Sequence, residues 1–147
     1  MPGIVCAIRG GPYSRPTIQK AIKLSKKSKQ RIFFLYVVNL EFLSNALHSN
    51  VVLMEEEITQ MGEFILFNAQ ETARKKGLEA EAVIRKGQVG HEIKQLCEEI
   101  GAEYVILGKP KSGQERNILD ATALDDFASD VEATCGAKVV YAEATRQ

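Results

Sequence analysis

Residues that form disulfides or bind metals are scarce in this sequence. Its 147 residues include three cysteines (Cys6, Cys97 and Cys135) and two histidines (His48 and His91). The cysteines are too few and too scattered for a disulfide framework, and each lies among apolar residues, where a free thiol usually acts as a small core residue. No Cys or His residues have the close spacing of a zinc site. We therefore expect neither disulfides nor a metal centre.

Long apolar runs are also missing. No apolar segment approaches the ~20 residues that a membrane-spanning helix needs. The chain enters an apolar segment at Ile4 and lacks the basic-then-apolar layout of a signal peptide. Apolar residues make up 45% of the chain and charged residues 26%, which is an ordinary globular balance. At this length we expect one domain, residues 1–147, in a cytoplasmic protein.

Acidic residues are absent from the first part of the chain. Residues 1–40 contain eight Lys and Arg and no acid, whereas residues 41–147 contain eleven basic and nineteen acidic residues. Most of the early charge falls in one helical stretch, at Lys20, Lys23, Lys26, Lys27 and Lys29. A solvated helix face is the simplest interpretation, and attraction of an anionic partner is the alternative.

Short β-prone segments alternate with amphipathic helical ones along the chain. The expected strands are 4–8, 32–38, 80–84, 104–107 and 138–141. A loose stretch from Asn39 to about Asn50 precedes a long amphipathic helix, in which we interpret Met54 and Met61 as core-filling residues. Glycines at 77, 101 and 136 end helices before strands. This alternation predicts a doubly wound α/β domain whose parallel sheet is covered by helices on both faces.

Ligands of such sheets bind outside the carboxyl ends of the strands, where the strand order reverses. The loops after the first and fourth strands are glycine-rich, which suits phosphate binding. Gly108–Gly113 has the outer glycines of a P-loop, but Gln114 and Glu115 stand where Lys and Ser or Thr are needed. Neither Gly10 nor Gly11 opens a dinucleotide fingerprint, and no nucleophile or metalloprotease signature is present.

Four segments, taken in order, resemble the universal stress protein family over nearly the whole chain. Ile4–Gly11 is similar to that family's first strand and turn, and Leu35–Asn39 is similar to the end of its second strand. Gly77–Gly87 and Gly101–Gly108 resemble its middle section. The resemblance implies a five-stranded parallel sheet in the order 3-2-1-4-5. It also implies a homodimer paired through the last strand, here Lys138, Val139, Val140 and Tyr141.

Some members of that family bind ATP through a G-x2-G-x9-G-S/T motif after the fourth strand. Gly108 matches its first glycine and Thr122 its hydroxyl residue, but Lys111 and Ala121 replace the other two glycines. Arg9 stands where the family has an acidic residue near the adenosine. Val37 keeps the apolar position beside the adenine.

These departures predict that ATP binding is impaired or altered. Lys in the positive-φ conformation that the second glycine permits would cost roughly 1 kcal/mol. Arg9, Lys109 and Lys111 would instead place three cations near one pocket mouth, unless the two lysines are simply solvated. The candidate ligands are ATP, AMP or another anionic molecule. The candidate site comprises Arg9, Gly10, Val37, Leu107, Gly108, Lys109, Lys111, Gly113, Ala121 and Thr122.

The resemblance implies a ligand-binding or regulatory module in stress response that is not an enzyme. We expect an unidentified regulatory protein partner, and neither a membrane nor a nucleic acid. One alternative is an ATP-pyrophosphatase-type enzyme, whose S-G-G-x-D-S loop partly matches residues 9–14, although Arg9 replaces the first Ser and Tyr13 the Asp. The other alternative is an interaction subunit whose pocket holds no ligand.

Overall fold

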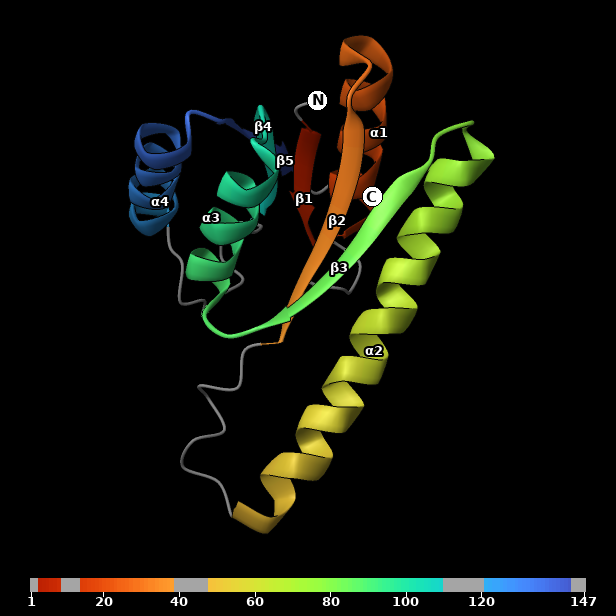
Figure 1. Cartoon of the computed structure of the whole chain (residues 1–147), viewed down its shortest axis with the longest axis vertical. Helices are drawn as coiled ribbons and strands as arrows, with labels where there is room; N and C mark the ends of the chain where they lie inside the picture. Colours follow the sequence, from red (N-terminus) through yellow and green to blue (C-terminus); the bar gives the residue numbers. More distant parts are fainter. Residues whose placement is uncertain (1–2, 9–13, 39–47, 110–120, 144–147) are drawn as a thin grey trace.

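The computed structural model describes residues 3–8, 14–38, 48–109 and 121–143, and Figure 1 gives the arrangement of their helices and strands. Nine elements alternate along this part of the chain. They are β1 (Gly3–Ala7), α1 (Ser14–Ser28), β2 (Arg31–Val38), α2 (His48–Lys75), β3 (Ala80–Lys86), α3 (Val89–Ile100), β4 (Tyr104–Lys109), α4 (Ala121–Cys135) and β5 (Lys138–Glu143).

The strands form one five-stranded sheet in the order β3-β2-β1-β4-β5, in which every neighbouring pair is parallel. This confirms the predicted fold class and strand order. Three strands run past their apolar segments, to Lys86, Lys109 and Glu143. The extension follows because backbone pairing continues regardless of side-chain polarity: Lys86 pairs with Val38, and Lys109 with Glu143.

Two apolar layers lie on opposite faces of the sheet. Ile4 and Cys6 of β1 pack with residues of α1 and α2, whereas Val5 packs with residues of α3 and α4. Figure 1 shows the same division, with α1 and α2 on one side of the sheet and α3 and α4 on the other. Ile4, Val5 and Cys6 have no exposed surface, as a strand covered on both faces requires. The less apolar β3 lies at an edge, as its composition predicts.

Helix α2 departs from the sequence prediction in two ways. It begins at His48, within the stretch that we expected to be loose up to about Asn50. Its methionines are also not core residues: Met54 is 38% exposed and Met61 is 56% exposed. The core-filling prediction for the two methionines is therefore wrong. Both methionines lie about a quarter turn around the helix from Gly62, which packs against Tyr36 and Ile84, so they flank the contact with the sheet. Figure 1 also shows that α2 projects beyond the sheet at its N-terminal end.

The C-terminal half of α2 packs tightly on β2 and β3. Leu66, Ala69 and Ala73 are at most 3% exposed. Gly62 lies against the ring of Tyr36, so a Cβ at this position would stand 2.7 Å from Tyr36 Cε2 and nearer still to its Cδ2. The small residues thus let the helix approach the sheet closely, and Gly62 admits the buried tyrosine ring.

We predict that Gly62→Ala destabilises the protein by about 1–3 kcal/mol, because the added methyl group overpacks against the Tyr36 ring. The sign of the change in the free energy of unfolding is informative, because alanine in place of glycine normally stabilises a helix interior by about 0.5–1 kcal/mol. Urea unfolding gives the free-energy difference. The same change in a Tyr36→Val background is the control and should be neutral or stabilising. Equal losses in both backgrounds would contradict the packing argument.

Candidate functional site

The carboxyl ends of β2, β1 and β4 lie side by side at one edge of the sheet. β1 has β2 on one side and β4 on the other, so the strand order reverses there. The Ile8 N–H donates to the Leu35 carbonyl oxygen at 2.9 Å and continues the pairing one residue past β1. The described parts of the chain at these strand ends stop at Ile8, Val38 and Lys109. This is the position at which doubly wound sheets bind ligands.

Apolar side chains line one face of this edge. Val37 and Leu107 both belong to the layer shared with α3 and α4, and Ala7 of the intervening strand lies in the same layer. Leu107 is 6% exposed, whereas Val37 and Ala7 are partly buried. The three side chains come from neighbouring strands and lie in one layer, with Val37 two residues beyond Leu35, the β2 partner of Ala7. Together they form an apolar wall that can contact the flat face of an aromatic ring.

Gly108 is pressed against the first turn of α1. A Cβ on Gly108 would lie 2.9 Å from the Thr17 hydroxyl oxygen. Thr17 is only 2% exposed, and its carbonyl oxygen accepts a weak hydrogen bond from the Cys6 thiol at 3.7 Å. The absence of a side chain at Gly108 therefore lets the end of β4 approach α1. This role of Gly108 does not depend on the wider φ range that glycine can adopt.

The other predicted site residues are less completely described. The backbone of Lys109 pairs with Glu143, and Ala121 and Thr122 form the start of α4, but nothing is described of these side chains. Four predicted residues lie outside the described ranges: Arg9, Gly10, Lys111 and Gly113. The structure thus brings Val37, Leu107 and Gly108 to one end of the sheet and leaves the predicted cations untested.

Thr17 is a site-forming residue that the sequence argument missed. It lies four residues before the buried Ala21, so the helical period already places it on the inner face of α1. The sequence signal for Thr17 was therefore its spacing of four residues from Ala21 at the beginning of the predicted helix.

Two cations near the ends of β2 and β3 are already paired with acids. Arg85 donates to Glu99 at 2.7 and 3.3 Å and lies 3.9 Å from Glu92, while Lys86 lies 2.7 Å from Glu55. The hydrogen bonds from Arg85 hold the pKa of Glu99 below its usual range, and those to Glu99 raise the pKa of Arg85. These charges link β3 to α3 and α2, and offer little to an anionic ligand.

A shallow hollow of about 610 Å³ lies between α1 and β5. Among the described residues, its lining consists of Pro16, Gln19, Lys20, Lys23, Tyr141 and Ala142. The hollow is open to solvent and adjoins the carboxyl end of β4, because Ala142 pairs with Gly108 and Pro16 precedes the Thr17 that Gly108 touches.

A family model described as the universal stress protein family matches residues 2–125. The chain belongs to this family. A relative from Bacillus subtilis (strain 168), universal stress protein YxiE, is 26% identical over 113 residues, which are 71% of this chain and 76% of that protein. The solved structure of universal stress protein UspA from Lactobacillus plantarum shares the fold, with a TM-score of 0.76 at 13% identity over 96% of this chain and 97% of that one.

Two further solved structures of universal stress proteins carry nucleotides. One is a complex with cAMP, with a TM-score of 0.65 at 13% identity over 98% of this chain and 98% of that one. The other, from Archaeoglobus fulgidus, is a complex with dAMP, with a TM-score of 0.61 at 14% identity over 97% of this chain and 98% of that one. At these identities the likeness establishes the fold shared by the family.

Among the described residues of this universal stress protein, no group of His, Cys, Asp and Glu could hold a metal ion. Within the same ranges, every helix is too short or too polar to cross a lipid bilayer.

The cysteines of this family member are free thiols, and two of them are buried. Burial raises the pKa of Cys6 far above its usual value. Burial, with a smaller contribution from the neighbouring Cys135, raises the pKa of Cys97 to about 12. A thiol with so high a pKa stays protonated at neutral pH and is a poor nucleophile. The prediction that Cys6 and Cys97 are core residues is confirmed, and Cys135 is half-buried.

We predict that alkylation of the native protein by iodoacetamide at pH 8 modifies Cys135 first. Cys6 and Cys97 should react only after unfolding, because both are buried and protonated. Peptide mass spectrometry over a time course measures the order, and denaturation in guanidinium chloride before alkylation is the control. Early labelling of Cys6 would contradict a closed core around β1.

Proposed function

We propose that this chain is a nucleotide-binding regulatory module of the universal stress protein family that prefers adenosine monophosphate to ATP. The observation that carries the proposal is the apolar wall of Ala7, Val37 and Leu107 beside Gly108, at the point where the strand order reverses. An apolar wall next to a glycine-containing turn suits a ligand with one flat apolar end and one anionic end.

The nucleotide class is supported by the relatives. Two solved universal stress proteins with the same fold carry cAMP and dAMP, which share an adenine ring and a single phosphate. In this chain the adenine would lie against Val37, and the phosphate would lie toward the end of β4 at Gly108. Both positions belong to the described part of the sheet edge.

The preference for one phosphate rests on the loop sequence after β4. Wrapping a triphosphate needs backbone N–H groups along the loop, which glycines expose best. Lys111 and Ala121 replace two of the glycines of the ATP motif. A β-carbon at each position restricts φ and blocks close approach of the backbone, so ATP loses contacts that a monophosphate does not need.

Positive charge for the phosphate comes from Arg9, Lys109 and Lys111 in this proposal. Arg85 and Lys86 already have acidic partners. Hydrogen bonds to a charged group contribute roughly 1.5–3 kcal/mol each when they are partly desolvated. The same lysines in full solvent would contribute far less.

Binding rather than catalysis is the favoured activity. Both buried thiols have raised pKa values, and no metal cluster exists among the described residues. The ATP-pyrophosphatase alternative depends on residues 9–14, a loop that the universal stress protein model itself covers. The alternative of an interaction subunit without a ligand is distinguished from our proposal by whether nucleotides stabilise the protein.

We predict that AMP raises the melting temperature more than Mg-ATP does at equal concentration, and that inorganic phosphate has a smaller effect. Ligand binding to the folded state stabilises it by RT ln(1 + [L]/Kd), so the ranking follows affinity. Arg9→Ala and Lys111→Ala should each weaken the AMP effect. Lys26→Ala, on the exposed face of α1, is the matched control and should leave it unchanged.

Restoring the missing glycines is the sharper test. The Lys111→Gly/Ala121→Gly variant should bind ATP at least tenfold more tightly, which is about 1.4 kcal/mol, and calorimetry measures the gain. Micromolar ATP binding by the unmodified protein, about −8 kcal/mol, would contradict the stated preference. If no nucleotide stabilises the protein beyond matched chloride, the binding proposal fails and the interaction subunit remains.

We also propose that two copies pair through β5. This strand is an edge of the sheet, and Val139, Val140 and Tyr141 along it are partly buried. The Lys138 N–H donates toward β4, to the Glu103 carbonyl oxygen at 2.9 Å. Backbone donors alternate in direction along a strand, so those of Val139 and Tyr141 point to the open edge.

The outward N–H of Val139 already has an acceptor within the chain. The Val139 N–H donates to the Glu132 carboxylate at 3.1 Å, which blunts the edge in the single chain. A partner strand would displace this carboxylate and replace it with backbone carbonyl oxygens. Pairing around a two-fold axis would then extend the sheet across both copies.

We predict that Tyr141→Pro converts the dimer into a monomer, whereas Tyr141→Ala retains it. Both variants lose the tyrosine side chain, but only proline removes the outward N–H that the partner strand needs. Sedimentation velocity over a range of concentrations measures the mass. An unmodified protein that is monomeric throughout, or equal dimer affinity in the two variants, would overturn pairing through β5.

A further inference from the structure

Helix α2 presents large apolar side chains to solvent. Phe64 is 66% exposed, and Phe67 and Met61 are each 56% exposed. Residues three apart share one face of a helix, so the two phenylalanines form one patch. The buried residues Leu66 and Ala69 belong to the opposite face, which packs on the sheet. We call Met61, Phe64 and Phe67 the α2 stripe. Exposed aromatic residues in such a group indicate an interaction surface.

Charges on α2 are separated along its length on both flanks of the stripe. Glu56 and Glu57 precede it, and Arg74 and Lys75 follow it. Each acid lies about five full turns before one of the bases, so Glu56 shares its side of the helix with Arg74, and Glu57 shares its side with Lys75. All four are exposed, and within the described chain neither Glu56, Glu57 nor Lys75 forms an ion pair.

We propose that α2 of one chain pairs in antiparallel fashion with α2 of a second copy, around a two-fold axis that passes between Phe64 and Phe67. At the axis the four phenylalanines of the two helices meet. Because each helix runs the opposite way, Glu56 and Glu57 of one copy lie level with Arg74 and Lys75 of the other. The same contacts occur twice, as a two-fold interface requires.

Self-complementarity is the reason for choosing a second copy over a different protein. The midpoint between Phe64 and Phe67 is equally far along the chain from the acidic pair and the basic pair, so one register brings together both the phenylalanines and the opposite charges. Parallel pairing would instead place acid against acid and base against base. Antiparallel helices also align their dipoles favourably.

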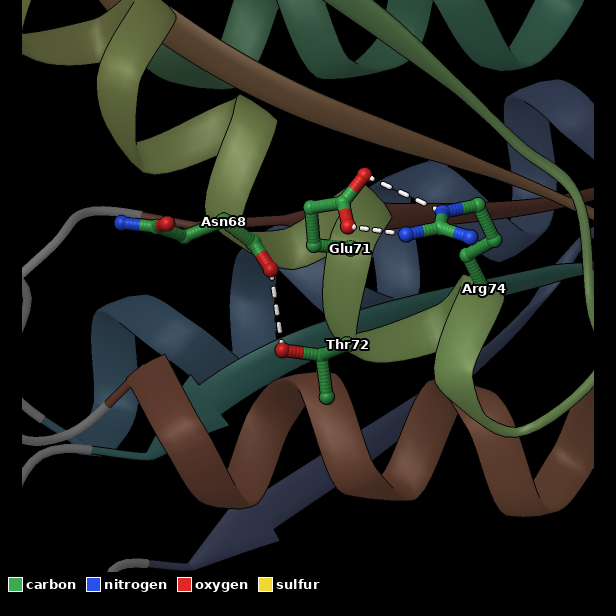
Figure 2. A network of polar contacts seen from close by, with 4 residues as sticks. All are labelled: Asn68, Glu71, Thr72 and Arg74. Atoms are coloured by element: carbon green, nitrogen blue, oxygen red, sulfur yellow. Dashed lines mark hydrogen bonds and ion pairs between the residues drawn. The ribbon is translucent and has the colours of Figure 1, made fainter.

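The basic end of the helix is already ordered for this contact. Arg74 donates to Glu71 at 2.6 and 3.2 Å, and Thr72 donates to the Asn68 carbonyl oxygen at 2.9 Å (Figure 2). Figure 2 shows that Glu71 holds the guanidinium of Arg74 near the helix surface. Because the Arg74 side chain is already ordered, it loses less conformational entropy when an acid of the second copy approaches. The hydrogen bonds from Arg74 also lower the pKa of Glu71.

The α2 surface is separate from the β5 edge. Helix α2 contacts β2 and β3, on the far side of β1 from β5. Pairing through α2 therefore adds a second association step and leaves the nucleotide site at the ends of β1 and β4 unchanged. Its failure would say nothing about nucleotide binding.

The test measures self-association of α2 variants in the Tyr141→Pro background, where pairing through β5 does not contribute. Sedimentation equilibrium should give a monomer–dimer equilibrium for the parent, and Phe64→Ser/Phe67→Ser should raise its dissociation constant at least tenfold. Lys26→Ser/Lys27→Ser, which changes two exposed residues of α1, is the matched control and should leave the constant unchanged.

Charge reversal tests the antiparallel register itself. Glu56→Lys/Glu57→Lys and Arg74→Glu/Lys75→Glu should each fail to dimerise alone, because like charges then face one another. An equimolar mixture of the two should dimerise, since every facing pair is then of opposite sign. If Tyr141→Pro does not fold, the same α2 substitutions are made in the unmodified chain. Sedimentation equilibrium then measures the association of β5-paired dimers into a larger assembly.

Two results would overturn the proposal. One is a parent that shows no concentration-dependent association, in which case a different protein or solvent covers the α2 stripe. The other is a mixture of the charge-reversed variants that associates no better than either alone, which excludes the antiparallel register.

Discussion

The complete burial of β1 is the constraint on which the rest of the structure depends. Ile4, Val5 and Cys6 have no exposed surface, so their backbone N–H and C=O groups cannot bond to water and must pair with β2 and β4. Parallel pairing on both sides in turn requires a crossover after each strand, and the helices of these crossovers cover the two faces of the sheet. The reversal of strand order at β1 follows from the same arrangement, and it is the position at which doubly wound sheets bind ligands.

The candidate site combines a rigid part with a variable part. Ala7, Val37 and Leu107 belong to strands, and Gly108 is held against Thr17, so the apolar end of the site is set by the core. In our proposal the charged end is supplied by Arg9 and Lys111, which lie outside the described residues. Proteins of 13% identity can share this fold because the strand pattern tolerates many different apolar residues.

Helix α2 illustrates where sequence periodicity stops being informative. The repeat of Ile58, Ile65 and Ala69 correctly predicted the helix and its inner face, because three- and four-residue steps always bring side chains to one side. The same period also suggested that Met54 and Met61 were buried, which is wrong. Three- and four-residue steps allow a wide apolar face, whereas the contact with the sheet covers only part of that face. Met61 directly precedes Gly62, which touches Tyr36, yet it lies about a quarter turn away from this contact and faces solvent.

The sequence by itself determined the alternation of strands and helices, the doubly wound class and the family, because these follow from apolar period and glycine position along the chain. It also predicted a site at the end of β4, where Gly108 follows the apolar segment of the strand. Only the tertiary structure decided that Gly108 touches Thr17, that Arg85 is occupied by Glu99 and Glu92, and that Phe64 lies in solvent. The physical reason is that each of these depends on which elements become neighbours in space, and packing between segments far apart in sequence leaves no local signal in either of them.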